Sequence, residues 1–321
     1  MTLDVDTLLD RRRLRRKVTT WRVLAVVAAL LAVGFLISTG DEVTGFLAPK
    51  QIARVSITGT ILEDRAQLKM LDEIAEAENV EALIVYVNSP GGTTTGGEAL
   101  YDGLRRIAEK KPVVAQFGTV AASAGYIVGL ASDHIVSRGN TITGSVGVIF
   151  QWPQVTDLLE KVGVQMKTVK SGALKAEPNP FTIPSPEALE VTGEMVADGF
   201  AWFHSLVESR RGIKITDVPG LKEGRIFSGR QAKDYRLVDE IGGEPEVLAW
   251  LEKERGVTAD LKVIDWKPSE PGQWGLSAMS SEIARSIAVG GAAGLSEAIT
   301  SSGISLLSLD GLVSVWHPRE N

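Results

Sequence analysis

The chain has 321 residues, enough for one large domain or two ordinary ones. Its net charge of −6 is unevenly distributed, because residues 1–22 carry seven basic and three acidic side chains and the remainder is strongly acidic. An acidic body gives no electrostatic reason to bind nucleic acid. The chain has no cysteine, which excludes disulfides, a thiolate nucleophile and cysteine-based metal sites, and its three histidines are too scattered to suggest a zinc motif. No metal or organic cofactor is expected.

Residues 23–40 form an uncharged apolar run that directly follows the basic cluster RRRLRRK and Trp21. As a helix rising about 1.5 Å per residue, the run would span roughly 27 Å, close to a bilayer core of about 30 Å. The positive-inside rule keeps the basic cluster in the cytoplasm. The sequence therefore predicts a cytoplasmic segment 1–22, a transmembrane helix 23–40 in contact with lipid, and an extracytoplasmic body. A cleaved signal peptide is the alternative, with a weak cleavage site at 38–40.

After a linker at 41–50, strand and helix patterns alternate along the chain. The run ALIVYV (82–87) is continuously apolar, as in a strand buried on both faces of a sheet. Further strands are expected at 52–57, 112–117 and 164–170, helices at 66–78, 96–110, 155–163, 186–211 and 244–255, and a helix with a turn at 224–243. This alternation predicts an α/β domain over 51–267 with a largely parallel sheet. The remaining stretch, 268–321, is rich in Ser, Gly and Ala and has no strong period.

Two short motifs have residues suited to acyl transfer. NSPGG (88–92) follows the apolar strand, and its glycines could present backbone N–H groups to a developing oxyanion. The alternative is an ordinary turn between a strand and a helix. In VAASAGYIVGL (120–130), small residues flank Ser123, which would lie near a helix N-terminus with the N–H of Ala124 close by. Here the alternative is that Ser123 is simply an N-cap.

A nucleophilic serine needs a base, and none of His134, His204 and His317 lies in a convincing context. Lysine is the base in Ser–Lys hydrolases, but with a pKa of about 10.4 in water it must be desolvated to act at neutral pH. Lys175 lies in SGALKAEPNPF (171–181), among small and apolar residues. The residues alone leave open whether it is a base or a solvated loop lysine.

Together, NSPGG, AASAGYI (121–127), TGSVGVI (143–149), KSGALK (170–175) and GRIFSGRQAKDYRLVDEIGG (224–243) resemble the signal peptide peptidases of the SppA (protease IV) family. The resemblance covers roughly 50–256, and it is the order of the motifs that makes it specific. It implies the fold shared by the Clp protease and the crotonases. The chain has AASAG where many relatives have AASGG, which adds a methyl group and removes no functional atom.

The resemblance also implies roles for particular residues. Ser123 takes the position of the nucleophile, Lys175 that of the general base, and Ser145 that of the serine that hydrogen-bonds the lysine amine. The oxyanion hole falls on Gly91 or Gly92, with the N–H of Ala124. The chain has one repeat, like the short members of the family, which form homo-oligomers in which Ser and Lys can come from neighbouring subunits.

The sequence thus predicts a serine endopeptidase anchored in the bacterial inner membrane, with its catalytic domain in the periplasm. Signal peptide remnants and other apolar peptides are the expected substrates. One alternative is a crotonase-like enzyme acting on acyl-CoA, which would meet little CoA outside the cytoplasm. Another is a scaffold without catalytic activity in a membrane assembly.

Overall fold

The computed structural model describes residues 21–22, 24–27, 49–268 and 313–315. Contacts divide the chain into one unit of Gln51–Glu76 with everything from Val80 onward, and another of the chain up to Lys50 with Ala77–Asn79. Most of the predicted anchor, and the segments at 1–20 and 269–312, lie outside the described residues. Where the chain is described, no helix is both long enough and apolar enough to cross a bilayer.

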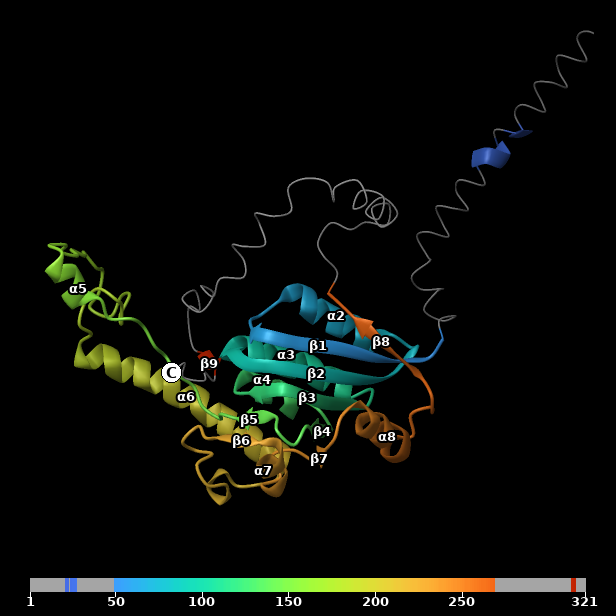
Figure 1. The fold of residues 1–321 in the computed structure, drawn as a ribbon. Helices are drawn as coiled ribbons and strands as arrows, with labels where there is room; N and C mark the ends of the chain where they lie inside the picture. The colour runs from blue at the N-terminus through green and yellow to red at the C-terminus, as the bar shows by residue number, and fades with distance from the viewer. Residues whose placement is uncertain (1–20, 23, 28–48, 269–312, 316–321) are drawn as a thin grey trace, which may run out of the picture. The chain divides into compact units, whose positions relative to one another are not determined.

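A nine-stranded sheet forms the centre of the larger unit (Figure 1). Its main path runs β6–β5–β3–β2–β1–β8, with β4 and β7 continuing from β3. Pairing is parallel except between β5 and β6 and between β2 and β9, so the predicted largely parallel α/β fold is confirmed. The strands are β1 (Gln51–Ile61), β2 (Val80–Thr93), β3 (Val113–Ala122), β4 (His134–Ser137), β5 (Ile142–Gly144), β6 (Ile226–Ser228), β7 (Glu240–Ile241), β8 (Lys262–Trp266) and β9 (Val313–Val315).

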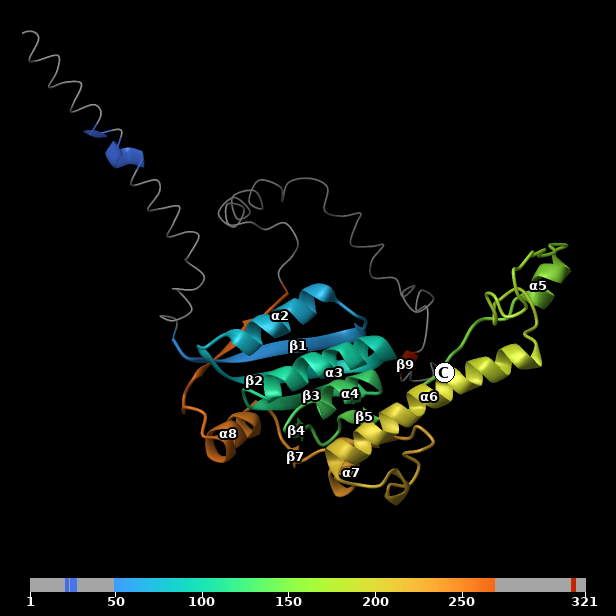
Figure 2. The same ribbon diagram turned by 180° about the vertical axis from the view of Figure 1, so that it is seen from behind.

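Helices cover both faces of the sheet, which explains the continuous apolar run in β2. Helices α2 (Arg65–Glu76), α3 (Thr94–Ala108) and α4 (Ala124–Leu130) lie together on one face (Figure 2). Helix α8 (Glu244–Arg255) packs Val247 and Leu251 against Ala82 and Ile84 of β2 in an apolar cluster. Because side chains alternate between the faces of a strand, Leu83 and Val85 point to the other side and are also fully buried.

Strand β1 extends beyond its outer neighbour. Strand β8 pairs with Gln51–Val55 only, while β1 continues to Ile61. The chain reaches Pro268 two residues after β8 ends, and proline cannot donate to a ladder. Within the described residues, the outer edge of β1 from Ser56 to Ile61 is therefore unpaired.

Residues 150–192, called the arm below, extend away from the sheet in both views (Figures 1 and 2). The arm holds α5 (Thr156–Lys161) and the start of the 26-residue helix α6 (Pro186–Arg211). The other end of α6 is fixed to the body, because Phe203 is buried and the Arg210 guanidinium donates to the carbonyls of Leu130 and Ser132 at 2.8 and 2.9 Å. Helix α5 buries no side chain.

The strand expected at 164–170 is absent, and this prediction was wrong. Its apolar residues Val164, Met166 and Val169 are exposed, and no described strand runs beside them to complete a ladder. The segment at 224–243 contains the expected helix, α7 (Gly229–Asp234), together with the short strands β6 and β7, which the sequence did not suggest.

Candidate active site

Three parallel strands, β2, β3 and β5, bring the motifs together at their carboxyl ends. In β2 and β3, Ser89 is paired with Ala121, and in β3 and β5, Ala122 is paired with Gly144. The NSPGG motif, Ser123 and Ser145 therefore meet at one edge of the sheet, although 57 positions separate the first and last of them in sequence. This edge is where open α/β sheets usually place ligands.

Ser123 lies in a sharp turn between β3 and α4, with φ 58° and ψ −121°. Its N–H donates to the carbonyl of Gly144 at 2.9 Å, and its own carbonyl accepts from the N–H of Tyr126 at 2.9 Å. The side chain makes no capping hydrogen bond to α4. Ser123 is therefore the N-cap residue of α4 by position, as the alternative expected, but its hydroxyl does not cap the helix. A non-glycine residue held at positive φ is costly and marks a position that the fold constrains strongly.

Small residues around Ser123 permit this turn. A Cβ added to Gly125 would lie 2.8 Å from the carbonyl oxygen of Ser89, so only glycine fits between α4 and the end of β2. A Cβ on Gly97 of α3 would lie 3.2 Å from the methyl group of Ala124. The alanine in AASAG is thus accommodated because α3 has a glycine opposite it.

The two candidate oxyanion glycines differ in their contacts. Gly91 has φ 120°, and its N–H donates to the hydroxyl of Ser89 at 3.1 Å. A Cβ on Gly92 would lie 1.9 Å from the carbonyl oxygen of Ile61, so β1 and β2 approach too closely for any side chain there. Gly91–Thr93 also pairs with β9 in antiparallel fashion, which shows that this stretch of β2 can take an extended chain.

A cavity of about 550 Å³ opens beside Ser123. Ser145, which has φ 52°, lies in its lining, and so do the mostly apolar residues that follow it in sequence. The opposite wall comes from the middle of α6, at Gly193, Val196, Ala197 and Phe200, and Lys222 and Glu223 complete the lining. The sequence reasoning missed the α6 wall, since these residues carry no signal beyond helical spacing.

Lys175 is not part of this cavity. It lies in the arm, and its side chain is exposed in this chain. Figures 1 and 2 show the arm projecting from the start of α6, whereas Ser123 lies beside α4 in the body. One copy of the chain therefore brings Ser123, Ser145 and the NSPGG motif together but leaves Lys175 apart from them.

Of the histidines described by the structure, His134 lies far from Ser123, and His204 is not among the residues that line the Ser123 cavity. His134 starts β4 and is paired with Val114, nine residues before Ser123 on β3, which corresponds to roughly 30 Å along the strand. Its ring stacks on Trp250 and contacts the Glu240 carboxylate at 3.3 Å. His204 packs against Phe200, and its Nε2 atom is buried without a hydrogen-bond partner among the described residues. Desolvation lowers the pKa of His204, while His317 lies outside the described residues.

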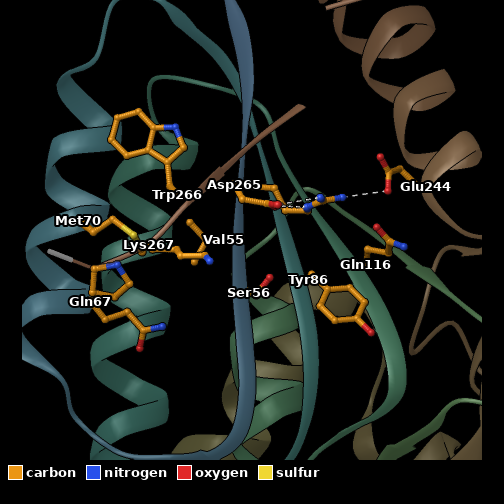
Figure 3. Close-up of a pocket in the computed structure, with 12 residues that line it drawn as sticks. Val55, Ser56, Gln67, Met70, Tyr86, Gln116, Glu244, Asp265, Trp266 and Lys267 are labelled. Atoms are coloured by element: carbon orange, nitrogen blue, oxygen red, sulfur yellow. Dashed lines mark hydrogen bonds and ion pairs between the residues drawn. The ribbon is translucent and has the colours of Figure 1, made fainter. Parts of the chain in front are cut away.

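A second cavity, of about 400 Å³, lies beside the edge of β1 (Figure 3). Arg54 is fixed in it by the carboxylates of Asp265 and Glu244, with nitrogen–oxygen distances of 2.5 and 3.0 Å. These contacts raise the pKa of Arg54, led by the hydrogen bond to Asp265. None of the residues predicted to be catalytic lines this cavity, so we place the candidate active site at Ser123.

The α/β fold agrees with the Clp-like class of proteins, which two family models identify. A family model described as Clp protease matches residues 51–140, and one described as Peptidase family S49 matches residues 105–258. Sequence relatives extend this assignment. A provisionally named protease of Synechocystis sp. is 36% identical over 218 residues, covering 67% of this chain and 78% of the relative.

A provisionally named signal peptide peptidase SppA of Enterococcus faecium is 35% identical over 237 residues, covering 70% of this chain and 69% of the relative. Protease 4 of Haemophilus influenzae is 28% identical over 244 residues, and the match covers 39% of its length. The chain belongs to peptidase family S49. It is a serine peptidase, which sets aside the crotonase-like and non-catalytic alternatives.

Proposed function

We propose that this chain is an endopeptidase in which Ser123 attacks the substrate carbonyl and Lys175 of a neighbouring copy acts as general base. The observation that carries the proposal is the division of the site. Ser123 and Ser145 line one cavity, whereas Lys175 is exposed on the arm of the same chain. A lysine in water is a poor base, so this site is incomplete until something desolvates the amine.

The surface of the arm supports a second copy as the covering partner. Large apolar side chains are exposed along it, where most soluble proteins would bury them or use them as an interface. They include Leu158, Val162, Met166, Phe181, Ile183 and Val191. An arm packed on a neighbouring copy would cover these side chains and transfer Lys175 out of water at the same time.

The chemistry then follows from the groups at the carboxyl edge. The neutral amine of Lys175 accepts the Ser123 proton as Oγ bonds to the carbonyl carbon, and the protonated amine then gives that proton to the leaving nitrogen. Water hydrolyses the acyl-enzyme with the same lysine as base. The hydroxyl of Ser145, on the cavity wall, would hold the amine in place.

For the oxyanion we assign the N–H groups of Ala124 and Gly92. Ala124 is the first residue of α4, so its N–H has no partner within the helix. The N–H of Gly91 is already engaged by the Ser89 hydroxyl, which favours Gly92 among the two glycines. Gly92 lies between β1 and β9 in the sheet, so a substrate that reaches it must take the place of β9. Donors of this kind stabilise the charge that develops in the transition state.

The cavity supports apolar peptides as substrates. Its walls from Val146, Val148, Val196 and Phe200 suit an apolar side chain next to the cleaved bond. An extended substrate could pair with Gly91–Thr93 as β9 does. Signal peptide remnants at the inner membrane fit this chemistry, and an uncleaved anchor at 23–40 would hold the periplasmic domain beside them.

The shared site is tested by mixing two inactive variants. Ser123→Ala and Lys175→Met should each lose at least about a thousandfold in turnover, because nucleophile and base each contribute on that scale. Co-expressed with different tags and purified as a doubly tagged assembly, they should regain activity. In random mixed rings, about a quarter of the sites would receive both intact residues.

Reaction with a fluorophosphonate provides the control, since it reports an activated serine. The Lys175→Met protein should react only in the mixed assembly, and Ser137→Ala should behave like wild type. Zero activity in a verified mixed assembly would refute the shared site and leave a site within one chain. Near-native turnover by Lys175→Met alone would refute lysine as the base.

A further inference from the structure

The loop that carries Lys175 is closed at its base by an ion pair. The Lys170 ammonium contacts Oε1 of Glu177, and only 20% and 10% of the two side chains are exposed. This is unusual within the arm, where α5 buries no side chain at all. By comparison, the ion pair Lys69–Glu73 leaves 76% and 47% of its side chains exposed. Burial of this kind indicates an ion pair held in one geometry.

Further hydrogen bonds converge on the same carboxylate. Oε1 of Glu177 also accepts from Nδ2 of Asn179 at 3.1 Å and from the hydroxyl of Thr182 at 3.3 Å. Asn179 in turn accepts from the N–H groups of Phe181 and Thr182 at 2.9 and 3.1 Å. The carboxylate is therefore the centre of a network that fixes the chain on the C-terminal side of Lys175.

The segment between the paired residues is a compact turn. The N–H of Lys175 donates to the carbonyl of Gly172, and the N–H of Glu177 donates to that of Leu174, both at 3.2 Å. Ala176, directly after Lys175, has φ 60°, a strained value that a loop keeps only when its ends are fixed. The ion pair between Lys170 and Glu177 supplies that fixation.

The pair also matters electrostatically. A lone carboxylate two residues from Lys175 would stabilise the protonated amine and so oppose its use as a base. Lys170 cancels that charge. Within the described chain, Lys170 is the charged group that contacts Glu177, and the other contacts to its side chain are from the uncharged Asn179 and Thr182. The hydrogen bond from Lys170 lowers the pKa of Glu177, so the carboxylate is ionised at neutral pH.

We propose that Lys170 and Glu177 are positioning residues that form a charge-neutral clamp on the Lys175 loop. The clamp fixes the loop in the conformation that presents the Lys175 amine, and it does so without adding net charge beside the base. This inference rests on the proposed role of Lys175. It is independent of whether Lys175 serves its own chain or a neighbouring one.

The clamp predicts opposite effects for its two halves. Glu177→Gln leaves the Lys170 charge unbalanced, which disfavours the protonated Lys175 amine, so activity should begin at a lower pH. Lys170→Met leaves the Glu177 charge unbalanced, which favours the protonated Lys175 amine. The acid limb of the pH–activity profile should then move to higher pH. For charges roughly 10 Å apart, between water and a protein surface, each shift is about 0.3–1 pH unit. A purely structural role would give losses without opposite shifts.

The experiment measures kcat and KM against pH for the full-length protein carrying each single change. Lys167→Met and Glu160→Gln are the matched controls, since both residues are exposed on the arm. Both single variants should lose about tenfold or more in kcat with little change in KM, and their acid limbs should move in opposite directions. The exchange Lys170→Glu with Glu177→Lys should restore kcat and the wild-type limb.

Thermal unfolding and circular dichroism show whether each variant is folded. If one single variant fails to fold, the other still gives the sign of its shift. Limbs that stay in place, or that move in the same direction, overturn the clamp while leaving the peptidase proposal intact. Near-native turnover by Lys175→Met would instead remove the basis of both proposals.

Discussion

The strained turn at Ser123 leads to a test on stability. With φ 58° and ψ −121°, a residue with a Cβ costs about 1–3 kcal/mol that glycine avoids. Ser123→Ala keeps the Cβ and therefore the strain, whereas Ser123→Gly relieves it. Both variants lose the hydroxyl and should be inactive, so the comparison isolates the backbone.

Two other effects separate glycine from alanine at any buried position. Glycine forgoes the burial of one carbon, about 0.8 kcal/mol, and loses about 0.5–1 kcal/mol more chain entropy on folding. Ser137 supplies the reference, because it is 0% exposed, as Ser123 is 1% exposed, and lies in regular strand β4. The free energy of unfolding of Ser137→Gly should therefore be lower than that of Ser137→Ala by about 1.5 kcal/mol.

The assay is urea unfolding of the four variants, with the glycine-minus-alanine difference taken at each site. At position 123 the relief of backbone strain should offset the loss of burial and of chain entropy. The Ser123→Gly protein should therefore be at least as stable to unfolding as the Ser123→Ala protein. The two sites should then differ by about 2 kcal/mol. An equal penalty at both sites would refute the idea that the turn stores strain.

Gly92→Ala should lower the free energy of unfolding by several kcal/mol or prevent folding, since its Cβ would lie 1.9 Å from the Ile61 carbonyl oxygen. The control Gly172→Ala places its Cβ in open space and should leave the free energy of unfolding unchanged in the same assay. Burial lowers the pKa of His204 in the folded protein below its unfolded value of about 6.5, so folding favours the neutral ring. The contribution of this ring to the free energy of unfolding is fully present above about pH 6.5 and is lost as the pH falls through the folded-state pKa. His204→Phe should therefore lose less stability than wild type between about pH 7.5 and 5.5, and an equal loss would contradict this. Alkaline phosphatase fused after Asn321 should be active in cells, as an extracytoplasmic C-terminus requires, and activity of a cytoplasmic reporter instead would overturn the topology.

Much of the fold could be predicted because its signals are local. The apolar run 82–87 and the helical spacing of 66–78 reflect burial that each segment needs. The prediction of a strand at 164–170 was wrong because it, too, used only a local pattern. Its residues satisfy that pattern but have no neighbouring strand to pair with among the described residues. Periodicity indicates which face could be buried and says nothing about whether a partner exists.

The site was predictable only in part. The parallel order of β2, β3 and β5 made the meeting of the NSPGG motif, Ser123 and Ser145 a consequence of topology. Nothing local encodes the positive φ of Ser123 or the contribution of α6 to the cavity wall, since both depend on distant packing. The preference for Gly92 over Gly91 likewise depended on a single hydrogen bond, which the Gly91 N–H donates to the Ser89 hydroxyl.

The edge of β1 from Ser56 to Ile61, unpaired within the described residues, has a consequence for handling and redesigning this protein. The outward-facing backbone donors and acceptors of this stretch are the kind of template on which two molecules can associate edge to edge. The stretch limits that hazard with exposed threonines at 58 and 60 and a kink at Gly59, whose φ is 71°. A change that flattened it, such as Gly59→Val, would lose this protection and favour aggregation. The same edge is also the natural position for grafting an additional strand.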